Sequence, residues 1–86
     1  MLNANNFTTG IVKSWMRDFG FIREDGTGQE VFAHFTAIVG FGLKEYKYLV
    51  PGARYRFLKV PSPKIEGAYL ALCVERESEN DSSNTN

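Results

Sequence analysis

Asp18-Phe19-Gly20-Phe21-Ile22 is the first of two runs that decide the fold of this chain, and the second is Val31-Phe32-Ala33-His34-Phe35. Successive side chains of a β-strand point to opposite faces, so the two phenylalanines of the first run share one face. Phe32 and His34 share one face of the second run in the same way. If these rings faced inward, the aliphatic residues of both runs would be exposed. We therefore expect a sheet with aromatic rings on its outer surface.

The rest of the chain adds three expected strands to the two that contain these runs. β-Branched and aromatic residues enrich these segments, and Asp25-Gly26-Thr27-Gly28 predicts a tight turn between the second and third strands. The expected strands are residues 7–17, Phe19–Glu24, Gln29–Phe35, Arg54–Val60 and Ala68–Val74. Short strands separated by turn signals predict an all-β fold, a small antiparallel barrel.

The connections and the core follow from the same pattern. Thr36-Ala37-Ile38 is expected to form one helical turn, and residues 39–52 form a long loop. Cys73 lies in an apolar strand, where we expect it to pack as an inert side chain. The residues expected to point inward are Val12, Ile22, Val31, Ala33, Tyr55 or Phe57, Leu70, Leu72 and Val74. Aromatic residues outnumber these positions, so some rings must lie outside.

Length and cysteine content limit the class of protein. The chain has 86 residues, enough for one domain, and its single cysteine excludes an internal disulfide bond. The first six residues carry no basic or apolar stretch, and no run approaches the ~18 apolar residues of a membrane span. We expect a cytoplasmic protein with a flexible arm at residues 1–6, a barrel at 7–76 and a disordered acidic tail at 77–86.

The net charge of zero conceals two oppositely charged parts. Residues 7–74 contain nine Lys or Arg and six Asp or Glu, a balance of +3. Residues 75–86 contain four acidic residues and Arg76, a balance of −3. A mildly basic body is compatible with a nucleic-acid partner, although a strong duplex binder is usually more basic.

Four motifs, in order, are similar to those of the bacterial cold-shock domain family, over roughly residues 9–74. They are Gly10-Ile11-Val12-Lys13, Phe19-Gly20-Phe21-Ile22, the run from Val31 to Ile38 and Pro51-Gly52. This resemblance implies a five-stranded barrel of the OB type that binds single-stranded RNA or DNA with low sequence preference.

The resemblance also implies which side chains make the contacts. Bases would stack on the rings of the two aromatic motifs. Those rings belong to Phe19, Phe21, Phe32, His34 and Phe35. Lys13 matches a lysine that would lie beside the nucleic-acid backbone, and Glu30 matches an acidic position that accepts hydrogen bonds from base edges.

The chain departs from the family pattern at the end of its first strand. With the lysines aligned, Ser14 stands where the family has a stacking tryptophan, and Asp18 replaces a glycine in a shortened connection. Trp15 either replaces the missing ring through a shift of register or a bulge, or occupies the neighbouring aromatic position of the family pattern. A packing role at the barrel rim is the third alternative, and all three remain open from the sequence.

Other candidates lie in turns and in the long loop. Arg17 and Lys44 are candidate phosphate contacts, and Phe41 stands between two glycines as a candidate additional stacking ring. Tyr46 and Tyr48 would instead close the loop on the barrel.

These features predict a single-stranded nucleic-acid-binding protein of the chaperone type, which captures unpaired bases without a cofactor or ATP. The alternative is a protein-interaction module that uses the same rings and the long loop. An enzyme is disfavoured, because no motif places a nucleophile beside His34, and one Cys with one His makes no structural zinc site. We expect a monomer, with oligomerisation through the aromatic face or the loop left open.

Overall fold

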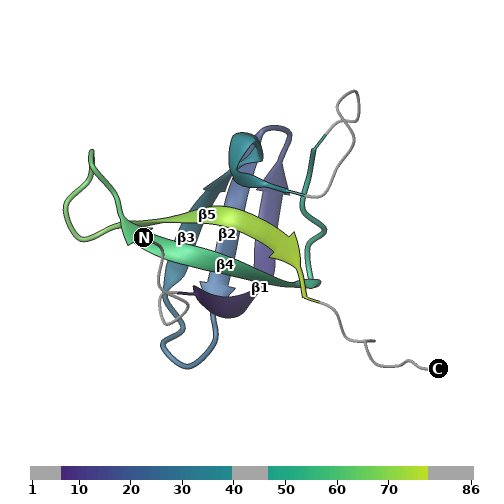
Figure 1. The fold of residues 1–86 in the computed structure, drawn as a ribbon, viewed down its shortest axis with the longest axis horizontal. Coiled ribbons are helices and arrows are strands. Elements are labelled where there is room, and N and C mark those ends of the chain that lie inside the picture. The colour runs from purple at the N-terminus through teal and green to yellow at the C-terminus, as the bar shows by residue number, and fades with distance from the viewer. Residues whose placement is uncertain (1–6, 40–46, 78–86) are drawn as a thin grey trace.

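The computed structural model describes residues 7–39 and 47–77. Five strands close into a barrel in the order β1-β2-β3-β5-β4. The elements are β1 (Phe7–Met16), β2 (Phe19–Glu24), β3 (Glu30–His34), the 3-10 turn η2 (Phe35–Ala37), β4 (Arg54–Pro61) and β5 (Tyr69–Arg76). In Figure 1, β4 and β5 cross in front of the β2–β3 hairpin. The expected all-β, five-stranded barrel is therefore confirmed.

Strand pairing is antiparallel around the barrel except at one seam. β3 and β5 are parallel, and the register there pairs Phe32 with Leu70. A second parallel bridge joins Ile38 to Val74 beyond the ends of β3. This seam places the ring-bearing strand β3 directly beside β5, which is far away in sequence.

The element boundaries differ from expectation by one or two residues. β1 ends at Met16 because Arg17 has a positive φ of 52° and begins the two-residue connection to β2. β3 ends at His34, because Phe35 already belongs to the 3-10 turn. β5 extends to Arg76, two residues beyond the expected end. Among the described residues, no helix has the length and apolar character needed to cross a membrane.

The barrel interior contains most of the residues expected there. The buried core cluster comprises Val12, Ile22, Val31, Ala33, Ile38, Leu49, Tyr55, Phe57, Ala71 and Val74. Two expectations were wrong: Leu70 is only half-buried, and Leu72 is 39% exposed. Ala71 is the residue of β5 that points inward at this level. The physical reason is the backbone at Cys73, which interrupts the alternation of β5, so Leu70 and Leu72 do not share the inward face of Val74.

Cys73 is exposed rather than packed, so that expectation was also wrong. Its φ is +51°, a left-handed conformation that interrupts the alternation of β5. Leu72 and Cys73 are consequently both exposed, and Val74 returns to the core. Residues 1–6, 40–46 and 78–86 are outside the described part of the chain, and with them the expected arm, most of the expected tail, Phe41, Lys44 and Tyr46.

Candidate nucleic-acid interface

The rings of β2 and β3 form one cluster on the outer face of the barrel. The register pairs Phe21 with Phe32 and Phe19 with His34. The Phe32 ring centroid lies 5.6 Å from that of Phe19, with the planes 29° apart, and 5.8 Å from that of Phe21, edge to face. The residues that alternate with these rings along β2 and β3 are buried in the barrel. They are Gly20, Ile22, Val31 and Ala33.

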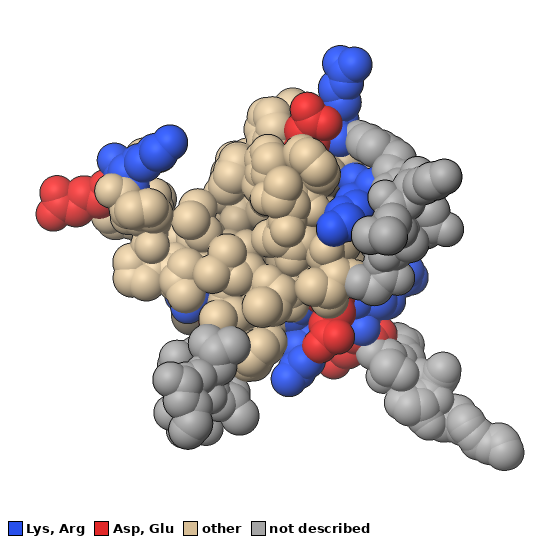
Figure 2. Space-filling view, turned by 45° about the horizontal axis from the view of Figure 1, so that its top comes forward, with Lys and Arg blue, Asp and Glu red and all other residues tan. Residues whose placement is uncertain are grey.

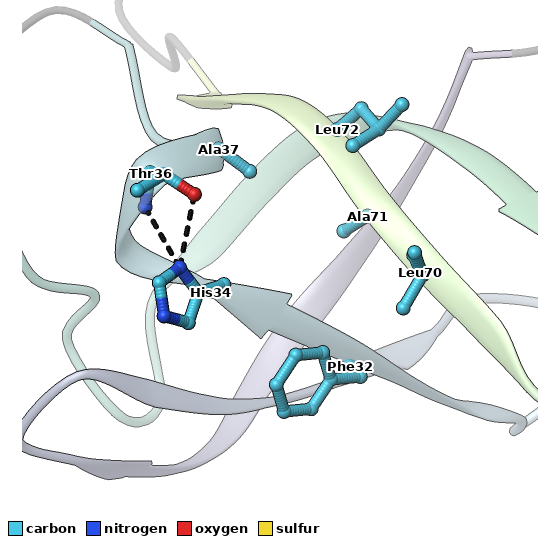
Figure 3. Close-up of a pocket in the computed structure, with 7 residues that line it drawn as sticks. All are labelled: Phe32, His34, Thr36, Ala37, Leu70, Ala71 and Leu72. Carbon is cyan, nitrogen blue, oxygen red and sulfur yellow. Dashed lines mark hydrogen bonds between the residues drawn. The ribbon is translucent and has the colours of Figure 1, made fainter. Parts of the chain in front are cut away.

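His34 extends this cluster at the end of β3. The backbone N–H of Thr36 donates to His34 Nδ1 at 3.4 Å, and Thr36 Oγ1 lies 2.9 Å from the same nitrogen (Figure 3). Because Nδ1 accepts, the neutral imidazole carries its proton on Nε2, which makes Nε2 a donor. The ring centroids of His34 and Phe35 are 4.7 Å apart. Phe35 is half-buried and also packs against the core.

A β-bulge in β1 determines which side chains reach this face from the first strand. The β1–β2 register shifts between Val12 and Ser14, so that Ser14 pairs with Phe21. Met16 pairs with Phe19 and is 57% exposed. Met16 was absent from the sequence-based candidates, since the bulge that places it outside leaves no pattern in the residues.

Trp15 lies on the opposite side of β1. It pairs with Gly20, whose position faces the barrel interior, and its side chain packs against the core. Its indole Nε1 is buried and has no hydrogen-bond partner in the described part of the chain. This placement favours the rim-packing alternative for Trp15, and it leaves Ser14 as the β1 residue beside the Phe21 ring.

Charged residues also adjoin the ring cluster on the outer face. Lys13 Nζ lies 2.5 Å from Glu30 Oε2, and both side chains are about half exposed, at 50% and 45%. The hydrogen bond from Lys13, its positive charge and, more weakly, the charge of Arg23 hold the pKa of Glu30 below its ordinary value. Arg17 is exposed in the β1–β2 connection. Arg23 is also exposed and follows Phe21 on the outer face, which strand alternation alone would have indicated.

The cations of β4 are held by carboxylates. Lys59 Nζ lies 2.7 Å from Glu24 Oε1, and Arg56 pairs with Glu75. Arg54 pairs with two carboxylates, those of Asp25 at 2.5 Å and Glu77 at 2.9 Å. The Arg54 and Thr9 hydrogen bonds hold the pKa of Asp25 below its ordinary value. These cations therefore form ion pairs within the barrel itself.

Two hollows adjoin Phe32 at the β3–β5 seam. One has a volume of about 220 Å³ and contains no charged residue (Figure 3). Its lining residues are Phe32, His34, Thr36, Ala37, Leu70, Ala71 and Leu72. The other has a volume of about 360 Å³. It is lined by Phe21, Phe32, Ser62, Lys64, Ile65, Ala68 and Leu70. Sequence analysis did not identify this extension of the ring face, because only the seam places Leu70 beside Phe32.

Apart from Lys64, the residues that line these hollows carry no Lys, Arg, Asp or Glu side chain. Figure 2 shows a broad uncharged face with Lys, Arg, Asp and Glu gathered at its margins. Ile65 is 63% exposed in the connection between β4 and β5. In residues 7–39 and 47–77, no group of three or more His, Cys, Asp or Glu is arranged to hold a metal ion.

A closed five-stranded barrel with rings on the outer face of β2 and β3 defines a fold of the OB type. Residues 8–68 match the family model described as the 'Cold-shock' DNA-binding domain, and the chain belongs to this family. The expected family and the OB-type fold are therefore confirmed.

Two bacterial proteins and one solved structure illustrate this relationship. The chain is 41% identical over 56 residues to cold shock-like protein CspG of Shewanella violacea, covering 62% of this chain and 74% of that protein. It is 46% identical over 52 residues to cold shock-like protein CspA of Vibrio cholerae, covering 57% and 69% respectively. The solved structure of drosophila Unr CSD456 shares the fold, with a TM-score of 0.65 at 19% identity. That comparison covers 90% of this chain but only 29% of the Unr chain.

Proposed function

We propose that this protein binds single-stranded RNA or DNA by stacking unpaired bases on the rings of Phe19, Phe21, Phe32 and His34. The observation that carries the proposal is the continuous contact of Phe32 with both Phe19 and Phe21 on the outer side of a closed barrel. Phe19 is 36% exposed, and Phe21 and Phe32 are half-buried. A chain normally buries phenylalanine, so ring surface gathered on the outer face supports a ligand that covers it. Membership of a family of DNA-binding domains supports a nucleic acid as that ligand.

The ring geometry suits unstacked bases. Residues two apart on a strand are separated by about 7 Å, which allows each ring to contact a different base of an extended strand. Each base–ring stack contributes roughly 1–3 kcal/mol and depends little on base identity. The ring cluster would therefore give low sequence preference, and His34 Nε2 adds one hydrogen-bond donor at its edge.

The surrounding residues would orient the strand. The exposed side chains of Lys13 and Arg17 would contact phosphates, and Phe35, whose ring centroid lies 4.7 Å from that of His34, would support the imidazole. Lys44 and Phe41 remain predictions outside the described residues. Binding of bases that are already unpaired draws weak hairpins toward their open form by mass action, which requires no cofactor or ATP.

A second candidate is a protein-interaction surface. The specific observation in its favour is the uncharged, apolar extension formed by Leu70, Leu72 and Ile65, the last two of which are 39% and 63% exposed. Stacking partners need flat rings, whereas these aliphatic side chains would also suit an apolar protein segment.

The test is a titration of a fluorescein-labelled oligothymidylate or oligouridylate with the full chain, followed by fluorescence anisotropy. We expect Phe32→Ala to weaken binding about tenfold or more, because Phe32 contacts both neighbouring rings. Phe7→Ala is the matched control, since Phe7 lies on β1 beside Arg56 of β4 and away from the ring cluster. Thermal unfolding of each variant checks that the fold persists.

Two outcomes would contradict the proposal. The first is the absence of any anisotropy change with the native chain at micromolar concentration. The second is an equal loss of binding in Phe7→Ala and Phe32→Ala, which would indicate a general loss of stability rather than a lost stacking ring.

A further inference from the structure

A row of exposed residues lies beside the rings on the outer face of β1, β2 and β3. It consists of Ile11, Lys13, Arg23 and Glu30. The register places Ile11, Arg23 and Glu30 side by side across these three strands. Arg23 follows Phe21 by two positions on β2, so their side chains share the outer face about 7 Å apart. This row is thus the direct continuation of the ring cluster.

The ion pair of this row crosses a whole strand. Lys13 belongs to β1 and Glu30 to β3, and β2 lies between them in the barrel. Lys13 Nζ and Glu30 Oε2 nevertheless approach to 2.5 Å, so both side chains lean over the outer face of β2. β2 contributes Phe21 and Arg23 to this part of the face. The Glu30 carboxylate is therefore held at Lys13 across the strand that carries Arg23.

This row contains two cations, Lys13 and Arg23, and one carboxylate, that of Glu30. Lys13, Arg23 and Ile11 line a hollow of about 210 Å³ on the outer surface. Glu30 pairs with Lys13, and in the described part of the chain no carboxylate lies within 4.0 Å of the Arg23 guanidinium. On β4, by contrast, Arg56 and Lys59 each have their own carboxylate partner. The hollow therefore retains a net positive charge.

We propose that Lys13 and Arg23 form a phosphate-binding site for the nucleotide next to the one stacked on Phe21, and that Glu30 is the resident anion which this phosphate displaces. The site rests on the proposed function, because the rings deliver the strand to it. A phosphate offers oxygens to both cations at once, whereas within residues 7–39 and 47–77 the Glu30 carboxylate accepts its hydrogen bond from Lys13 alone. Exposed ion pairs contribute little to folding, so the exchange leaves the barrel intact.

The test measures the affinity of the full chain for a labelled oligothymidylate at several salt concentrations. Arg23→Gln should weaken binding about two- to fivefold, the range for one exposed charge contact. It should also lower the magnitude of the slope of log K against log[salt] by about 0.7, the value for one phosphate of a single strand. Arg56→Gln removes the same charge from β4 and should leave both quantities close to those of the native chain.

Glu30→Gln should have the opposite effect. Without the resident anion, we expect binding about two- to fivefold tighter and a steeper salt dependence. Glu75→Gln makes the same change of net charge away from the row and is the matched control. A weaker affinity in Glu30→Gln would overturn the proposal and indicate instead that Glu30 accepts hydrogen bonds from bases.

The outcomes separate this site from the proposed function. If Phe32→Ala abolishes binding while Arg23→Gln changes neither affinity nor salt slope, the rings bind nucleic acid and the phosphate site is wrong. If the native chain does not bind at all, the proposed function fails and the site with it.

Discussion

The indole of Trp15 lies over Gly20, and a Cβ atom at residue 20 would be 2.7 Å from Trp15 Cε3. The same Cβ would lie even closer to the carbonyl oxygen of Ser14. These contacts join β1 to β2 at the end of the barrel that supports the Phe19 and Phe21 rings. The missing side chain of Gly20 therefore allows the tryptophan to close the barrel under the candidate interface.

Gly20→Ala should destabilise the protein by about 2 kcal/mol or more, because the nearest obstacle is backbone and the strands would have to separate. Urea denaturation gives the change in the free energy of unfolding. Gly26→Ala is the control: its Cβ would meet nothing within 4 Å, and only its positive φ of 84° makes it costly, by about 1–2 kcal/mol. An equal or smaller loss in Gly20→Ala would show that the strands adjust freely.

Ser14→Phe should strengthen single-strand binding. Ser14 pairs with Phe21 on the outer face, so a ring there adds one stacking position to the cluster. One additional stack contributes roughly 1–3 kcal/mol, which corresponds to a fivefold or greater gain in affinity. Anisotropy titration of a labelled oligonucleotide measures it, and Ser14→Leu controls for added apolar area without a flat ring. A gain as large in Ser14→Leu would argue against stacking at this position.

Trp15→Phe should leave the affinity for single strands unchanged, because the indole packs against the core rather than beside the rings. The loss of packed area should be partly offset, since the substitution removes a buried N–H that has no partner among the described residues. Far-UV circular dichroism follows thermal unfolding without relying on the single tryptophan. A loss of affinity comparable to that of Phe32→Ala would instead place Trp15 in the interface.

Glu24→Gln should destabilise the protein at neutral pH and much less in acid. Burial raises the pKa of Glu24, but hydrogen bonds from Lys59, Thr27 and Thr8 outweigh this effect and hold the pKa below its ordinary value of 4.5. The unfolded chain therefore binds the proton more readily, and the contribution of the pair to stability is lost as the pH falls below 4.5.

At pH 7 we expect Glu24→Gln to lower the free energy of unfolding by roughly 1.5–3 kcal/mol, the range for a hydrogen bond to a charged group. The side chains of Lys59 and Glu24 are only 20% and 10% exposed, which limits screening by solvent. Glu75→Gln, in an ion pair with both side chains nearly half exposed, should cost under about 1 kcal/mol. A difference between Glu24→Gln and the native chain that persisted unchanged to pH 3 would contradict the assignment.

Cys73→Asn should stabilise the protein by about 0.5–1 kcal/mol, because asparagine tolerates the left-handed conformation that Cys73 adopts at φ +51°. Thermal unfolding compares it with Cys73→Ala, which has no polar side chain to hydrogen-bond the left-handed backbone and should show no such gain. Because the thiol is exposed, the native chain should also react with a thiol reagent without unfolding. A thiol that reacts only in denaturant would place Cys73 inside the protein.

The strongest sequence-based predictions came from local alternation. Phe19 and Phe21 share a face because every strand alternates, and the burial of Gly20 between them and of Ile22 after them follows from the same rule. Alternation also explains the position of Arg23 beside Phe21, although the sequence analysis overlooked it. Predictions failed where backbone geometry breaks alternation, as at Cys73, whose positive φ moves Leu72 out of the core.

The β3–β5 seam and the position of the β1 bulge could not be predicted from the sequence, for a different reason. Leu70 lines the ring face only because β5 pairs with β3 in parallel, and this pairing joins segments far apart in sequence. The bulge between Val12 and Ser14 decides that Ser14 faces outward and Trp15 inward, a choice that the residues themselves left open. Both features depend on the hydrogen-bond register between two strands, which the local sequence does not determine.

The sequence by itself determined the barrel, its family and the rings that alternate outward on β2 and β3, because side-chain period and turn residues are local properties. The tertiary structure alone decided what surrounds those rings: Ser14 rather than Trp15 at one edge, Leu70 at another, and the Lys13–Glu30 ion pair across β2. The physical reason is that neighbours across a sheet are set by register and closure of the barrel, and a shift of one residue reverses the face of every side chain that follows.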